Sequence, residues 1–82
     1  MTNPYPALVE HTIQRLEERY RVNCDENDYD SLCSKVKTGN AILITRTDAT
    51  RAQYYVPYLG RTVRVVWDST IDRIITALPL RR

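Results

Sequence analysis

Residues 60–79 read GRTVRVVWDSTIDRIITALP, and this stretch decides the fold. Apolar and polar residues alternate through residues 62–67 (TVRVVW), which is the period of a strand with one buried face. Turn residues follow at 68–70 (DST), and residues 73–78 (RIITAL) form a second run that Pro79 ends. The stretch therefore predicts two antiparallel strands joined by a short turn.

The same pattern upstream predicts two more strands. Residues 41–46 (AILITR) and 52–58 (AQYYVPY) are rich in β-branched and aromatic residues, with turn residues between them at 48–50 (DAT). Residues 59–60 (LG) supply a hairpin turn before the next strand. Pro57 has no N–H, so it must lie on an edge strand or at a strand end. Because short turns join all four strands, we expect an antiparallel meander.

The N-terminal part of the chain has the period of a helix. Four apolar residues recur at spacings of four, three and four, which places them on one helical stripe: Val9, Ile13, Leu16 and Tyr20. This stripe predicts a helix at residues 5–21. Thr12, Arg15 and Arg19 line one flank of the stripe, and His11 points away from the core.

A second helix is predicted at residues 27–38. Asp25 or Asn27 caps its start, and Gly39 allows the left-handed conformation that ends a helix. Its buried stripe has the same helical spacing: Tyr29, Leu32, Cys33 and Val36. Neither layer can bury its apolar side alone, so the helices must cover one face of the sheet. The sequence therefore predicts one α+β domain, residues 1–82, with two N-terminal helices packed on a four-stranded antiparallel meander.

The composition indicates a folded domain that needs no metal or cofactor. Hydrophobic residues make up 43% and charged residues 27% of the chain, which argues against disorder. The two cysteines lack the further His or Cys ligands of a zinc site, and two glycines are too few for a phosphate-binding loop. There is neither a signal peptide nor an apolar run of about 18 residues, so we expect a cytoplasmic protein without a membrane partner.

The charge is unevenly distributed, although the net charge is only +2. From Thr45 onward there are seven Arg and no Lys, against three Asp. The planar guanidinium suits recognition of phosphate or carboxylate groups. The alternative is that these arginines only flank solvated strands, and both interpretations stay open.

His11, Arg15 and Arg19 recur every four residues, so all three can face one groove beside the first helix. In a functional interpretation His11, the single histidine, is a general acid or base near neutral pH, and Arg15 and Arg19 bind substrate phosphates. The alternative is a solvent-facing histidine and arginines that pair with Glu18 or with aspartates elsewhere.

The last two strands carry a second group of candidates. With a turn near Thr70, Arg64 lies roughly opposite Thr76 on an exposed sheet face. Tyr54 and Tyr58 on the neighbouring strand offer ring faces on which a base can stack. Alternatively, Thr76 is simply a good strand former, and the tyrosines are core and edge aromatics.

The series His11, Arg15, Arg19-Tyr20, followed by a capped helix and the stretch 60–79, resembles the RelE-like ribonuclease superfamily (barnase–EndoU–colicin–RelE), which includes BrnT-type toxins. The resemblance implies two helices on a curved antiparallel sheet, with RNA bound on the sheet face and cleaved without a metal.

Carried over by position, the resemblance assigns roles to four residues. His11 is then the acid or base, Arg15 and Arg64 clamp the scissile phosphate, and Thr76 is a hydrogen-bonding residue of the site. Trp67 departs from the pattern, because relatives commonly have Tyr there. RelE toxins proper are also far more basic than +2, which weakens the ribosome-binding version of the function most.

Two functions from different classes follow. The first is a metal-independent ribonuclease of the toxin type, whose partner is RNA and whose catalytic residues are His11, Arg64 and Thr76. The second is a non-catalytic binding module, such as a phage or mobile-element inhibitor of a host protein, whose partner is a host or antitoxin protein. A homodimer joined through the edge strand at Pro57 or Ala41 is a third alternative.

Overall fold

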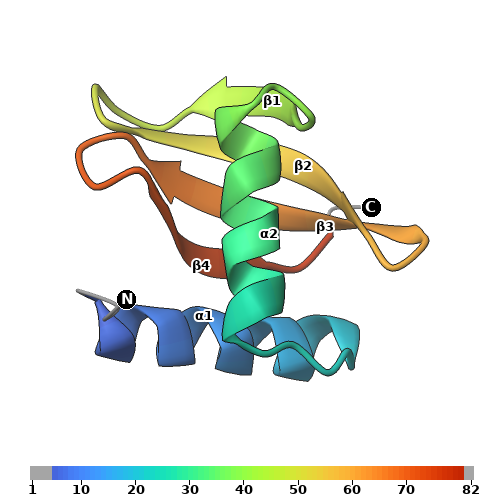
Figure 1. The fold of residues 1–82 in the computed structure, drawn as a ribbon. Helices are drawn as coiled ribbons and strands as arrows, with labels where there is room; N and C mark the ends of the chain where they lie inside the picture. Colours follow the sequence, from blue (N-terminus) through green and yellow to red (C-terminus); the bar gives the residue numbers. More distant parts are fainter. Residues whose placement is uncertain (1–4, 81–82) are drawn as a thin grey trace.

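The chain folds into two helices followed by four strands, as the sequence predicts (Figure 1). The computed structural model describes residues 5–80. The strands form one antiparallel sheet in the order β1-β2-β3-β4, which confirms the predicted α+β meander. The elements are α1 (Pro6–Tyr20), α2 (Glu26–Lys37), β1 (Ile42–Arg46), β2 (Arg51–Tyr58), β3 (Arg61–Asp68) and β4 (Arg73–Leu78).

Helix α1 begins at Pro6, where a missing N–H costs nothing, and ends at Arg21, which adopts a left-handed conformation (φ 53°). Three residues of the predicted stripe, Val9, Leu16 and Tyr20, are buried. Thr12, which the sequence places on a flank, is also fully buried. Its hydroxyl donates a hydrogen bond to the carbonyl of Ile74 on β4 (3.4 Å), so its polar atom is satisfied inside the protein.

Helix α2 begins with a capping box. The Asp25 carboxylate accepts from the N–H of Asp28 (2.9 Å), and the Asp28 carboxylate accepts from the N–H of Asp25 (3.2 Å). All four residues of the predicted stripe are buried, which confirms the helical period. Beyond the helix end, Gly39 has the expected positive φ of 86°.

The turns set the register of the strands. Leu59 and Gly60 both have positive φ (50° and 75°), as the two-residue turn of a tight hairpin requires. Between β3 and β4 the register shifts, because β4 contains one extra, bulged residue between Ile74 and Thr76. Pro57 lies one residue before the end of β2 and beyond the last β1–β2 pair, as a strand-end proline should.

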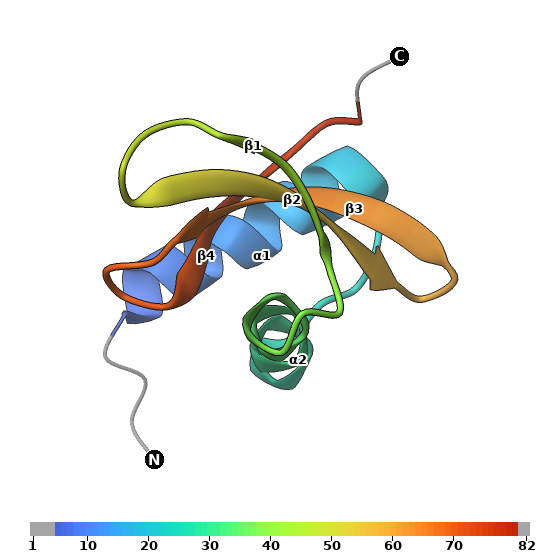
Figure 2. The ribbon, with the colours of Figure 1, turned by 90° about the horizontal axis from the view of Figure 1, so that it is seen from above.

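The two helices lie in different places relative to the sheet (Figure 2). Helix α2 crosses one face, whereas α1 runs beneath the β4 edge and packs mainly on that strand. The sequence predicted that both helices cover one face of the sheet. Helix α2 does so, whereas α1 covers the β4 edge. The most deeply buried apolar side chains come from both helices and three strands: Val9, Leu16, Tyr29, Leu32, Val56, Val63, Val65 and Ile74.

Side-chain hydroxyl groups from the helices satisfy the backbone of the edge strand β4. The carbonyl of Ile74 accepts from the hydroxyls of Tyr29 (2.7 Å) and Thr12 (3.4 Å). The Tyr20 hydroxyl donates to the carbonyl of Leu78 and accepts from the N–H of Arg64 (2.9 Å). Burial raises the pKa of both tyrosines, so the phenols stay neutral donors. These bonds close an edge that would otherwise expose carbonyl groups.

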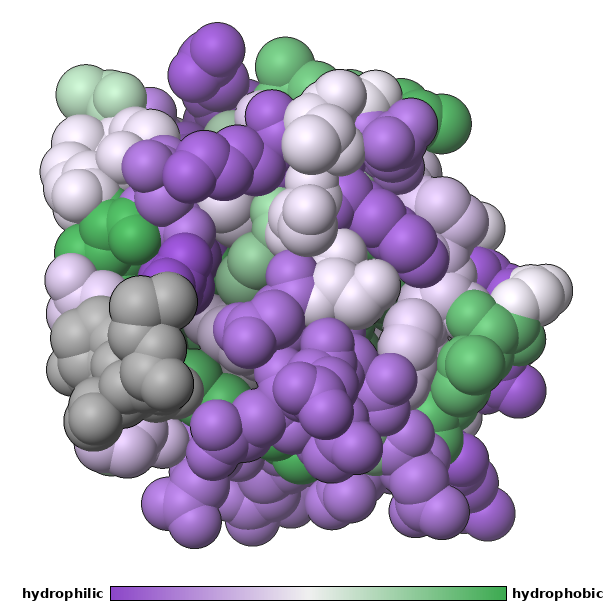
Figure 3. Space-filling view, in the orientation of Figure 1, coloured by the Kyte–Doolittle hydropathy of each residue, from purple (hydrophilic) through white to green (hydrophobic). Residues whose placement is uncertain are grey.

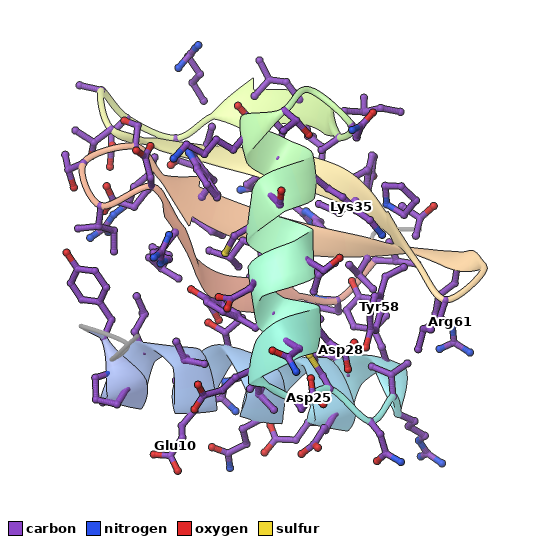
Figure 4. The ribbon with its side chains drawn as sticks, in the orientation of Figure 1. Glu10, Asp25, Asp28, Lys35, Tyr58 and Arg61 are labelled. Carbon is purple, nitrogen blue, oxygen red and sulfur yellow. The ribbon has the colours of Figure 1, made fainter. Side chains whose placement is uncertain are left out.

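A second set of bonds fastens the β2–β3 hairpin to the helices (Figure 4). The Tyr58 hydroxyl donates to the carbonyl of Asn23 (3.1 Å), and the Arg61 guanidinium donates to the carbonyl of Tyr20 at the end of α1 (2.6 Å). Lys35 reaches from α2 to the carbonyl of Pro57 (2.7 Å). The hairpin is thus held at both strands.

At the opposite edge of the sheet, β1, no helix of residues 5–80 provides such cover. Ile42 is 69% exposed and Leu43 is 45% exposed. The face that carries α2 is otherwise largely hydrophilic, and its hydrophobic atoms gather at the margins, some of them over β1 (Figure 3). The sheet therefore has one closed edge and one open edge.

The Tyr29 hydroxyl bond to β4 can be tested by Tyr29→Phe. We expect a loss of about 1 kcal/mol in the free energy of unfolding, since a buried hydrogen bond is removed while the ring is kept. Urea unfolding at an unchanged m-value measures the loss. Tyr54→Phe is the matched control, because within residues 5–80 its half-buried hydroxyl makes no hydrogen bond. Equal midpoints for wild type and Tyr29→Phe contradict the prediction.

Candidate functional site

The sheet face opposite α2 is lined by alternate residues of three strands. Strand register and pleat place these side chains together, because paired residues point to the same side and alternate residues of a strand share a face. We call this surface the open face and define it by Gln53, Tyr55, Arg64, Val66, Thr76 and Leu78. Among residues 5–80 no helix crosses it, and the C-terminal turns of α1 lie along its β4 side (Figure 2).

Two of the predicted catalytic residues meet at the border of the open face. The Nε2 atom of His11 lies 3.4 Å from the hydroxyl oxygen of Thr76, although the residues are 65 positions apart in the chain. His11 is exposed on α1, and Thr76 is partly exposed on β4. The imidazole is therefore accessible to a ligand and already has a polar neighbour.

The third predicted residue, Arg64, is held in a fixed orientation. Its Nε and Nη2 atoms both donate to the side-chain oxygen of Gln53 (2.9 Å for Nε), and Nη1 donates to the carbonyl of Pro79 (3.5 Å). Sequence reasoning missed Gln53. Gln53 alternates with Tyr55 and pairs with Val66, which places it on the open face. The alternation is visible in the sequence, whereas the pairing depends on the strand register.

The predicted pairing of Arg64 with Thr76 is wrong by two residues along β4. Thr76 pairs with Val66 and Arg64 pairs with Leu78. The Asp68–Arg73 pair places the centre of the turn between Thr70 and Ile71, which moves the pairing by one residue, and the bulge in β4 moves it by one more. Thr76 and Arg64 are nevertheless diagonal neighbours on the same face, with an expected separation of about 7–8 Å. His11, Thr76 and Arg64 therefore border one region of the surface.

Arg15 and Arg19 lie on α1, one and two turns after His11. The Arg15 guanidinium forms an ion pair with the Glu18 carboxylate (2.7 Å), which is the pairing that the sequence offered as the alternative. Both side chains of the pair are solvent-exposed to a third or more, so the pair contributes little to stability and is easily exchanged. Arg19 is exposed.

The predicted stacking residues Tyr54 and Tyr58 do not lie on the open face. Their strand neighbours Ala52 and Val56 are buried under α2, and Tyr58 itself is buried with its hydroxyl bonded to Asn23. Grouping them with Arg64 was therefore wrong, because the pleat turns them to the other side. The tyrosine that shares the face is Tyr55, which pairs directly with Arg64.

Neither cysteine can serve as a nucleophile at neutral pH. Cys24 and Cys33 are both free and buried, as predicted for Cys33. Burial raises the pKa of Cys24 from 9.0 to about 11 and also raises that of Cys33, so both thiols stay protonated. Among residues 5–80 no group of three His, Cys, Asp or Glu side chains is placed to hold a metal ion.

Two aspartates, Asp48 and Asp68, are hydrogen-bonded within the turns that join the strands. The Asp68 carboxylate accepts from the N–H and hydroxyl of Thr70, and Asp48 does the same for Thr50. These bonds lower the pKa of both carboxyl groups. Both aspartates therefore stabilise loops as carboxylates and are poor candidates for proton transfer near neutral pH.

A scan against protein-family models and searches of curated proteins and solved structures find no match to this chain. Within residues 5–80 no helix is long and apolar enough to cross a bilayer.

The cysteine environments predict slow alkylation in the folded state. At about pH 8 a thiol of pKa 11 has about a hundredfold less thiolate than one of pKa 9, and only the thiolate reacts. We therefore expect iodoacetamide to modify both cysteines far more slowly in buffer than in concentrated urea, as measured by mass spectrometry. N-acetylcysteine controls for the effect of urea on the reagent. Similar rates with and without urea refute the assignment.

Proposed function

We propose that this protein binds RNA on the open face and cleaves it as a metal-independent endoribonuclease of the toxin type. One observation carries the proposal, namely the contact of His11 with Thr76 (3.4 Å) on the same surface as the immobilised guanidinium of Arg64. An acid–base group, a hydroxyl and a phosphate-binding group are the elements of a site for phosphodiester transfer.

In the proposed reaction the nucleophile is the 2′-hydroxyl of the RNA. In the neutral imidazole whose Nε2–H donates to the Thr76 hydroxyl, Nδ1 carries the free lone pair, and this atom accepts the proton of the 2′-hydroxyl. The bond between the 2′-oxygen and phosphorus forms while the bond to the 5′-oxygen breaks. The departing 5′-oxygen takes a proton from water, and the hydroxide that remains takes the proton that His11 accepted. The products are a 2′,3′-cyclic phosphate and a 5′-hydroxyl, and His11 returns to its neutral form.

Arg64 and Thr76 have distinct roles in this proposal. Arg64 donates to the non-bridging phosphate oxygens, where negative charge builds up, and Gln53 keeps its planar group oriented for that contact. The Thr76 hydroxyl holds the imidazole at the border of the sheet. Arg15 and Arg19 on α1 attract the phosphates on either side, and Arg15 exchanges Glu18 for them.

The proposal is tested with purified protein, labelled single-stranded RNA and EDTA. We expect cleavage that leaves 2′,3′-cyclic phosphate ends, a loss of about a hundredfold in His11→Ala, and a loss of about tenfold in Arg64→Gln. Arg46→Gln is the matched control, because it removes the same charge from an exposed strand residue that pairs with Ala52 and so faces the other side.

Two results contradict the ribonuclease. One is RNA that stays intact in EDTA after prolonged incubation, and the other is a His11→Ala variant as active as the wild type. A toxin-type role also requires that expression of the wild type, but not of His11→Ala, slows growth of the producing cells.

The uncovered β1 edge supports a second candidate function, a non-catalytic module that binds a host or antitoxin protein. A strand with exposed Ile42 and Leu43 can accept a strand from a partner, whose side chains then bury these apolar groups.

This candidate is tested by Leu43→Lys, since an edge lysine disfavours strand pairing. We expect a partner protein to be captured by the wild type and to be lost with Leu43→Lys. Leu59→Lys is the control that keeps capture, because its leucine is even more exposed but lies in the β2–β3 turn. If the wild type, Leu43→Lys and Leu59→Lys all capture the partner, the partner does not bind at β1. Neither substitution is expected to change the cleavage of RNA.

A further inference from the structure

A groove opens on the sheet next to Arg64, at the start of β1. Its volume is about 270 Å³, and its walls come from the α2–β1 connection and from strands β1, β2 and β3. The residues that line it are Gly39, Asn40, Ala41, Ile42, Tyr55, Pro57 and Thr62. The ribonuclease proposal makes no use of this groove.

We infer that the groove binds one unpaired nucleobase of a single-stranded RNA whose phosphate lies on Arg64. This inference rests on the proposed RNA function. It adds a second subsite, which binds a base, and it specifies that the RNA is single-stranded. The position of the groove, its lining and the adjacent charge each support it.

Tyr55 links the groove to the phosphate-binding group. It pairs with Ile42 on β1, which lines the groove, and with Arg64 on β3, which lies on its other side. Side chains of directly paired residues are about 5 Å apart at Cβ. A phosphate on Arg64 and a base in the groove are therefore one strand spacing apart, a distance that a single nucleotide spans.

The lining suits the flat face and polar rim of a base. Tyr55, Pro57 and Ile42 provide the apolar surface, and an aromatic ring stacks with any of the four bases. Thr62 contributes an exposed hydroxyl, and the amide of Asn40 donates to Thr38 (3.0 Å), which leaves its oxygen to accept from a base.

The positive charge of Arg64 next to the groove favours a ligand that carries both a negative charge and a base. A guanidinium fixed by Gln53 beside an aromatic wall is complementary to a nucleotide, whose phosphate and base are rigidly joined. In a duplex both faces of a base are already stacked, so only an unpaired base can enter. The substrate class is therefore single-stranded RNA or an unpaired loop.

The experiment measures binding of a fluorescent single-stranded RNA to the His11→Ala protein, so that cleavage does not interfere. We expect Tyr55→Leu to weaken binding about tenfold, since stacking on one aromatic ring is lost, and Tyr55→Phe to leave the affinity unchanged. Tyr54→Leu is the matched control, because it makes the same change one residue away on the face under α2. The same sequence as a duplex binds more weakly than the single strand.

The outcomes separate the two proposals. If Arg64→Gln weakens binding but Tyr55→Leu does not, the groove is not a base site and the proposed function stands. If the single strand does not bind any of the proteins, both proposals fail. Amide chemical shifts provide a second measurement that needs no variant of Tyr55. Titration with a nucleoside monophosphate is expected to move the signals of Asn40, Ile42 and Thr62. If these signals do not move, the inference that the groove binds a nucleobase is wrong.

Discussion

The backbone carbonyl groups along the outer edge of β4 need hydrogen-bond partners, and this need determines where the two helices lie. A strand at the edge of a sheet leaves backbone groups unpaired, and here three helix hydroxyls, from Thr12, Tyr20 and Tyr29, bind the carbonyls of Ile74 and Leu78. This requirement places α1 along the edge and leaves α2 to cover the sheet alone (Figure 2). Within residues 5–80 the opposite face consequently has no helix over it, and the exposed His11 of α1 is brought to its border.

Much of the fold follows from the sequence because its signals are local. Helical and strand periods, the Asp25 cap, Gly39 and the turn at Leu59-Gly60 act over a few residues, and the structure confirms each of them. The alternation of residues along the strands was also sufficient to place Tyr54 and Tyr58 on the face away from Arg64. They share an apolar face that must meet the apolar face of β3, and Arg64 lies on the other side of that strand.

The candidate site was less predictable because it depends on long-range geometry. The contact of His11 with Thr76 exists only because α1 runs along β4, and no periodicity encodes that docking. The offset between Arg64 and Thr76 comes from the exact centre of the β3–β4 turn and from one bulged residue, neither of which the turn residues reveal. The chemistry of these side chains and their placement on one surface are the basis on which a function is proposed.

The unequal edges of the sheet also limit how copies of this chain can assemble. Among residues 5–80 the edge that a second molecule can extend is β1, where Ile42 and Leu43 are exposed, because α1 and the hydroxyl groups of both helices occupy the β4 side. Two copies joined through β1 form a closed pair with no free edge left to recruit a third. Growth by repeated strand addition, the route to fibres, therefore stops after one step.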